Sequence, residues 1–184
     1  LHAVLGHRHD RGVDPEPVPD PVAHLRAGQA HVLGPERQLR LHGRPDDLLG
    51  RVLEHGPDRP GDVVITENPT FLGALIAFNP SESTYATASS DEDGMDTDDL
   101  ARVLATEPRA KMIYVVPDFA NPTGTTLSLP RRHRLIELAN EHDVLVIEDT
   151  PYRPLRYSGD HLPTLKSMDT EGRVLHLGSF SKIL

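Results

Sequence analysis

Residues 112–149 read MIYVVPDFANPTGTTLSLPRRHRLIELANEHDVLVIED and decide the fold class of the chain. The stretch opens and closes with short apolar runs, Met112–Val116 and Val144–Ile147, which have the length and β-branched content of buried strands. Between them, apolar residues such as Leu135 and Leu138 recur at the spacing of one helix face. Continuous apolar strands that alternate with helices are typical of a parallel sheet covered on both faces.

The same alternation continues on both sides of this stretch. Three more short runs have strand character, and two more stretches have helical character. The predicted strands are Asp62–Thr66, Tyr85–Ala88 and Val174–Leu177, and the predicted helices cover Thr70–Phe78 and the residues after Asp96. We therefore predict an α/β fold with a mainly parallel sheet and flanking helices.

The predicted helices begin at recognisable capping residues. Asp96 is expected to cap one helix, and Ser128, with a proline in the first turn, the next. Arg131, Arg132 and Arg134 lie in the first turns of that second helix, where the helix dipole disfavours cations. This placement suggests salt bridges or an interface.

Composition separates an N-terminal part from the rest of the 184 residues. Residues 1–60 hold 8 of the 17 Pro and 7 of the 11 His. Prolines at alternate positions of Asp14–Pro21 exclude both a helix and a central strand there. We predict that residues 1–44 are weakly structured and that residues 45–60 lead into a folded domain.

Charge and composition also exclude classes of function. A net charge of −9 argues against nucleic acid as the main partner, because phosphate binding needs a basic face. The chain has no cysteine for a disulfide scaffold or a thiolate zinc site, and its histidines show no metal-ligand spacing, so no metal is predicted. No apolar run approaches the roughly 20 residues of a membrane span. The sequence thus predicts a cytoplasmic protein without a membrane partner.

Polar residues follow three successive predicted strands, at the edge where parallel sheets bind their ligands. Asn121 lies in an Asn-Pro-Thr-Gly turn, which could aim its amide at a ligand oxygen or be a simple loop. Asp149 ends a buried strand and is well placed to pair with a cationic ring nitrogen, and Tyr152 could present its hydroxyl to the same ligand. The alternatives are a solvent-facing or capping acid and a packed loop aromatic.

The third segment contains one of only three lysines in the chain. Lys182 follows the predicted strand Val174–Leu177 in a loop rich in glycine and serine, and a desolvated lysine can form a Schiff base. Ser179 and Ser181 could bond a phosphate. The alternative for Lys182 is a surface lysine near a chain end.

Taken together, these motifs resemble a known family. The chain from about Val63 to Leu184 resembles the large-domain portion of a fold-type I, pyridoxal-phosphate-dependent class I/II aminotransferase. The motifs TENPTFLGAL, NPTGTTLSLPRR, EDTPYRPLRYSG and GSFSKIL are similar to its 2-aminoadipate aminotransferase-like branch, to which the MocR-type regulators are related. The resemblance implies pyridoxal phosphate as cofactor, an L-amino acid and a 2-oxo acid as substrates, and a homodimer at full length.

The resemblance implies a role for each candidate residue. Lys182 matches the lysine that bonds covalently to the cofactor, and Asp149 matches the acid that pairs with the pyridine nitrogen. Asn121 and Tyr152 match the pair that hydrogen-bonds the phenolic oxygen, so Lys182, Asp149 and Tyr152 are the expected catalytic residues. The remaining cofactor-binding matches are Ser179 and Ser181 for the phosphate and Phe71 for the aromatic that stacks on the ring.

The resemblance is incomplete at both ends. Residues 42–45 do not match the family's phosphate-binding turn, and residues 1–41 match nothing in the family. This suggests a leader translated in a wrong reading frame, or else a divergent native leader. Two arginines that the family places beyond Lys182 are absent. We therefore expect residues 45–184 to be a partial large domain, truncated at its C-terminus and inactive alone.

Two other functions stay open beside the enzyme. One is a pyridoxal-phosphate-binding effector domain of a MocR-type transcription regulator, which needs a winged-helix segment that residues 1–60 do not resemble. The other is a non-catalytic α/β domain in which the motifs occur by coincidence.

Overall fold

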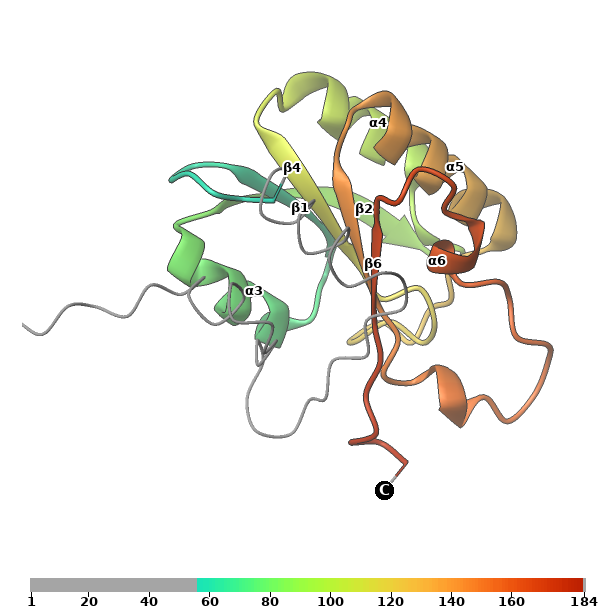
Figure 1. Ribbon diagram of the computed structural model, residues 1–184. Coiled ribbons are helices and arrows are strands. Elements are labelled where there is room, and N and C mark those ends of the chain that lie inside the picture. Colours follow the sequence, from blue (N-terminus) through green and yellow to red (C-terminus); the bar gives the residue numbers. More distant parts are fainter. Residues whose placement is uncertain (1–55, 184) are drawn as a thin grey trace, which may run out of the picture.

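The computed structural model describes residues 56–183, which form one six-stranded sheet and its helices (Figure 1). The sheet order is β3-β2-β1-β4-β5-β6. The strands are β1 (Val63–Asn68), β2 (Thr84–Asp91), β3 (Gly94–Met95), β4 (Ala110–Val115), β5 (Leu145–Asp149) and β6 (Val174–Leu177). The helices are α3 (Leu72–Phe78), α4 (Thr97–Thr106), α5 (Leu129–Glu141) and α6 (Leu165–Met168), with the 3-10 turns η1 (Asn79–Ser81) and η2 (Arg153–Leu155).

The pairing of the strands confirms the predicted mainly parallel sheet. β1 pairs in parallel with both β2 and β4, and β5 pairs in parallel with both β4 and β6. Only the short edge strand β3 among the described strands is antiparallel, in a hairpin with β2. The strand order reverses between β1 and β4, and α/β sheets bind their ligands beside such a reversal, at the carboxyl ends of the strands.

The two faces of the sheet are covered unequally. Helices α4, α5 and α6 pack on one face, and α3 lies on the other (Figure 1). Because side chains alternate along a strand, Ile113 and Val115 of β4 face the three helices, whereas Met112 and Tyr114 face α3. The larger cluster includes the predicted helix residues Leu135, Leu138 and Ala139.

The predicted helix caps differ in their outcome. Asp96 caps α4 as predicted, because its Oδ1 accepts the backbone N–H groups of Asp98 at 2.8 Å and Asp99 at 3.2 Å. Ser128 occupies the N-cap position of α5 as predicted, but its side chain makes no capping bond. Pro130 contributes to the difference, since it removes one of the two N–H groups that an N-cap hydroxyl can reach.

The arginines of α5 form the salt bridges that their position suggested. Arg131 pairs with Asp91 at the end of β2, and Arg134 bonds two glutamates of its own helix. Arg132 pairs with Asp118, and both side chains are fully buried. The predictions for residues 1–44 and for the phosphate-binding turn lie outside the described residues.

Candidate active site

The loops that follow β4, β5 and β6 meet at one edge of the sheet. In register, Val115 lies opposite Glu148, and Asp149 lies opposite Leu177, so the three strands end side by side. The loop after β4 contains Asn121, the loop after β5 contains Tyr152, and the loop after β6 contains Lys182. The topology therefore gathers segments that are 28 and 33 residues apart in sequence, from Asn121 to Asp149 and on to Lys182.

Asp149 is a buried acid at the end of β5, only 2% exposed. Its Oδ2 accepts a hydrogen bond of 2.8 Å from the Tyr114 hydroxyl on the neighbouring strand. Both residues continue the strand alternation that faces α3, the face on which Leu145 and Ile147 also lie. The sequence alone did not single out Tyr114. Side chains two residues apart on a strand point to the same side of the sheet, so Tyr114 and Val116 lie on the same face.

Asn121 and Tyr152 are brought into direct contact. The Asn121 Nδ2 donates to the Tyr152 hydroxyl at 3.3 Å. The Tyr152 oxygen thus acts as the acceptor in this bond, so the Tyr152 hydroxyl can still donate its own proton to an oxygen of another group. Tyr152 packs against the apolar cluster on the α3 side, as does Phe71, the residue directly before α3. Both aromatic rings therefore belong to the same face as Asp149.

Lys182 lies on the exposed side of this group. Its Nζ is 5.9 Å from the centroid of the Tyr152 ring, a distance at which a cation is attracted to the ring face. In the same loop, the Ser179 hydroxyl donates to Ser181 Oγ at 2.8 Å and accepts the Ser181 backbone N–H at 3.1 Å. The two serines therefore present their hydroxyls together, beside the lysine.

Glu67, at the end of β1, is an acid that sequence reasoning missed. It is 4% exposed, and its Oε2 accepts the Val116 backbone N–H at 3.2 Å, across the point where the strand order reverses. Burial raises the pKa of Glu67 to about 7. The sequence did contain a signal for Glu67, because this acid directly follows the predicted strand Asp62–Thr66. Asp149 was singled out for a similar position at the end of a predicted strand.

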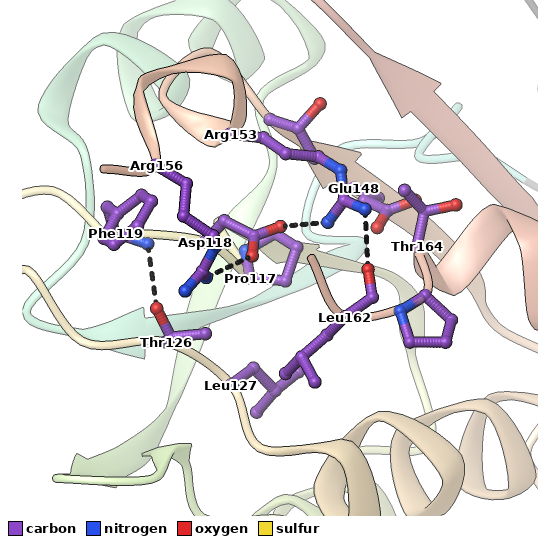
Figure 2. A network of polar contacts seen from close by, with 12 residues as sticks. Pro117, Asp118, Phe119, Thr126, Leu127, Glu148, Arg153, Arg156, Leu162 and Thr164 are labelled. Carbon is purple, nitrogen blue, oxygen red and sulfur yellow. Dashed lines mark hydrogen bonds and ion pairs between the residues drawn. The ribbon is translucent and has the colours of Figure 1, made fainter. Parts of the chain in front are cut away.

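A second missed acid, Asp118, lies behind the site and is fully buried. It forms ion pairs with Arg132, Arg153 and Arg156, two of which are drawn in Figure 2. Glu148 is buried nearby, and its two oxygens accept the backbone N–H groups of Leu165 at 2.7 Å and Lys166 at 2.9 Å. Burial raises the pKa of Glu148.

A cavity of about 270 Å³ lies beside the loop after β6, with Thr150, His176 and Ser179 in its lining. The Thr150 hydroxyl bonds His176 Nε2 at 2.8 Å and the Leu177 carbonyl at 3.0 Å. Side chains alternate along β6. The partly buried Leu175 packs on the α3 side of the sheet, so His176 points to the opposite side, as Val174 does. The cavity is therefore lined both by the end of β6 and by the loop that contains Ser179. Within residues 56–183, no group of three or more His, Asp or Glu could hold a metal ion, and no helix is long and apolar enough to cross a membrane.

The profile of one protein family, aminotransferase class I and II, matches residues 57–184. The chain belongs to this family. It is 43% identical over 142 residues to the aromatic-amino-acid aminotransferase 1 of Thermococcus litoralis, an alignment that covers 75% of the chain and 33% of that relative. It is 37% identical over 169 residues to the 2-aminoadipate transaminase of Thermus thermophilus, which covers 88% of the chain and 41% of the relative.

Solved aminotransferase structures share the fold. The kynurenine aminotransferase of Pyrococcus horikoshii, crystallised with PMP, superposes with a TM-score of 0.68 at 38% identity, over 89% of this chain and 42% of that one. The predicted fold and family are thus confirmed, and these relatives give no support to the regulator alternative. The chain spans about a third to two fifths of the length of the curated relatives it matches.

The donor set of the site fits pyridoxal phosphate, the cofactor of this family. A buried carboxylate, Asp149, suits a cationic ring nitrogen, and the Asn121–Tyr152 pair offers N–H and O–H donors to an oxygen on the same ring. Lys182 offers the amine for an aldehyde, and two serine hydroxyls beside it suit phosphate oxygens.

Proposed function

We propose that the protein built on this sequence transfers an amino group between an L-amino acid and a 2-oxo acid, with pyridoxal phosphate held by Lys182. The observation that carries the proposal is the convergence of Asp149, the Asn121–Tyr152 pair and Lys182 at one end of three parallel strands. Family membership supports the reaction class. When bound, the cofactor supplies a protonated ring that accepts electrons from the bond broken at the substrate's α carbon.

The chain's own residues have separable roles in this proposal. The Asp149 carboxylate would pair with the ring nitrogen and favour its protonated form, because an adjacent negative charge stabilises a cation. The Asn121 amide and the Tyr152 hydroxyl hold the phenolic oxygen. The Lys182 amine would hold the cofactor through its aldehyde carbon, with loss of water, and as a free amine it would take the α proton of the substrate and return it.

The phosphate and the ring face need further groups. Ser179 and Ser181 would hydrogen-bond the phosphate, since their hydroxyls lie 2.8 Å apart in one exposed loop. Phe71 would stack on the ring and offers no hydroxyl. The relatives are named for aromatic amino acids and for 2-aminoadipate, which supports an amino donor of one of these types.

A reduction experiment tests the covalent role of Lys182. The full chain is incubated with pyridoxal phosphate, reduced with borohydride, digested and mapped by mass spectrometry. We expect the phosphopyridoxyl group on Lys182, because its amine lies beside the cofactor-binding donors. The variant Lys182→Arg keeps the positive charge and should carry no adduct at this position. Equal labelling of Lys111, Lys166 and Lys182 would contradict the proposal.

Homodimer formation and a cytoplasmic location stay predictions. Leu72 and Ile76 are exposed on α3 and lie one helical turn apart, which supports a self-association surface. Sedimentation equilibrium of the full chain, compared with a Leu72→Glu, Ile76→Glu double variant, tests this. A monomer at all concentrations in the unchanged chain would contradict it.

A further inference from the structure

We propose that Asp118 is a positioning residue that fixes the Asn121–Tyr152 pair in the geometry needed to hold the cofactor's phenolic oxygen. The inference rests on the proposed function, because it concerns the same site. It is carried by an ionic network behind the site that joins the loop after β4 to the loop after β5 (Figure 2).

The Asp118 carboxylate is surrounded by cations. Its Oδ1 accepts from Arg132 Nη2 at 3.1 Å and from Arg156 Nη2 at 3.3 Å, and its Oδ2 accepts from Arg153 Nη1 at 3.0 Å. The carboxylate has no exposed surface. A buried charge is tolerated only when partners satisfy it, so these three arginines and Asp118 constrain one another's positions.

Arg132 anchors the network to the body of the protein. Its guanidinium is fully buried and donates to three backbone carbonyls besides Asp118. These carbonyls belong to Pro117, Leu127 and Pro163. Two of them stand at the two ends of the loop that contains Asn121, so Arg132 closes the base of that loop and ties it to α5.

The ion pair between Asp118 and Arg153 joins the same two loops as the Asn121–Tyr152 contact, close to it in sequence. Asp118 precedes Asn121 by three residues, and Arg153 immediately follows Tyr152. Arg153 is held in turn by the Leu162 carbonyl, to which its Nη2 donates at 2.6 Å (Figure 2). The Asn121–Tyr152 bond itself is long, at 3.3 Å, and both residues are partly exposed, so it contributes little to holding the loops together.

Arg156 adds a second constraint on the same loop. Its guanidinium lies 4.7 Å from the centroid of the Phe119 ring while it donates to Asp118. Phe119 has a left-handed backbone conformation, with φ of 56°, which is costly for an aromatic residue. Phe119 lies between Asp118 and Asn121 in the chain. Arg156 therefore contacts both Asp118 and the residue whose backbone conformation leads the chain toward Asn121.

The spectrum of the bound cofactor reports this positioning. Donors on the phenolic oxygen take up its negative charge, and so they lower the affinity of the nearby Lys182 nitrogen for its proton. If Asn121 and Tyr152 move apart, this affinity rises. The pH midpoint of the visible absorbance then shifts upward, a change that a loss of stability alone does not produce.

The test compares four forms of the full chain loaded with pyridoxal phosphate. Asp118→Asn keeps the side-chain size but turns one carboxylate oxygen into a donor that faces a guanidinium. We expect its pH midpoint to rise by about one unit. Arg153→Lys, which keeps the charge but not the two-pronged contact, should give a smaller rise. Asp91→Asn breaks the exposed pair with Arg131 and should leave the midpoint unchanged.

The outcomes distinguish the two proposals. A wild-type chain without a borohydride adduct at Lys182 overturns the proposed function, and this inference with it. An adduct at Lys182 together with unchanged midpoints in Asp118→Asn and Arg153→Lys overturns only the role of Asp118. If Asp118→Asn fails to fold, the midpoint of Arg153→Lys alone decides.

Discussion

Two parts of the candidate site are built on opposite principles. The loops after β4 and β5 are fixed from behind by the fully buried Asp118 and Arg132. The loop after β6 is partly or fully exposed, and the Ser179 and Ser181 side chains bond each other within it. The groups proposed to hold an oxygen at a set position are preorganised, whereas the amine proposed to bond and be released lies in an exposed loop.

The largest expected effect comes from removing the amine of the exposed loop. Lys182→Ala should abolish covalent capture of pyridoxal phosphate completely, because no other group at the site can bond its aldehyde. The free energy of unfolding should change by less than about 0.5 kcal/mol, since the side chain is exposed. Absorbance of the loaded chain and urea unfolding measure the two quantities. A large loss of stability would mean that the loop after β6 is anchored too.

The next effect should come from the buried anchor. Arg132→Met removes four hydrogen bonds and leaves Asp118 with less compensation, which should lower the free energy of unfolding by about 3–5 kcal/mol. Arg134→Met on the same helix is the control, because Arg134 forms only exposed pairs and should cost less than about 0.5 kcal/mol. Urea unfolding of both variants makes the comparison. Equal losses would show that the buried pair is no anchor.

A pH-dependent effect is expected on the anchored side, from Glu67. Its pKa is raised from 4.5 to about 7 by burial, so the folded state holds a proton that the unfolded state releases. This contribution is fully present below pH 4.5 and is lost as the pH rises toward 7, by about 3 kcal/mol in total. Glu67→Gln keeps an acceptor for the Val116 N–H without titrating. Relative to this variant, the wild type should lose stability between pH 5 and pH 8 in urea unfolding; parallel profiles would contradict the shift.

The smallest effect is expected from Ser181→Ala. Its hydroxyl bonds only in the exposed loop, so the free energy of unfolding should change by less than about 0.5 kcal/mol. Affinity for pyridoxal phosphate should fall modestly, by less than about tenfold, because one neutral hydrogen bond contributes about 1 kcal/mol. Equilibrium dialysis measures the affinity. An unchanged affinity would remove Ser181 from the proposed phosphate contacts.

Local pattern was sufficient for most elements of the fold. The strand predicted at Val174–Leu177 has the same bounds as β6, and the cap predicted at Asp96 makes two of the expected bonds. Such features depend on residues within a few positions of each other. Ser128 makes no side-chain capping bond, although Pro130, which contributes to this, is only two residues away in the sequence.

The candidate site was predicted only where a residue follows a strand directly or belongs to a recognised motif. Asn121, Asp149 and Lys182 met that condition, and the structure brings their segments together. Asp118 was missed because an acid between a proline and an aromatic has the pattern of an ordinary loop. Its importance depends on three arginines that lie 14, 35 and 38 residues further along the chain.

The sequence by itself determined the parallel α/β architecture, the family and the order of the polar residues after the strands. Only the tertiary structure decided that β1 lies between β2 and β4, that Glu67 is buried beside that reversal, and that Asp118 anchors two loops. The reason is physical: periodicity and capping are set by neighbours in sequence, whereas desolvation of a charge and its compensation are set by neighbours in space.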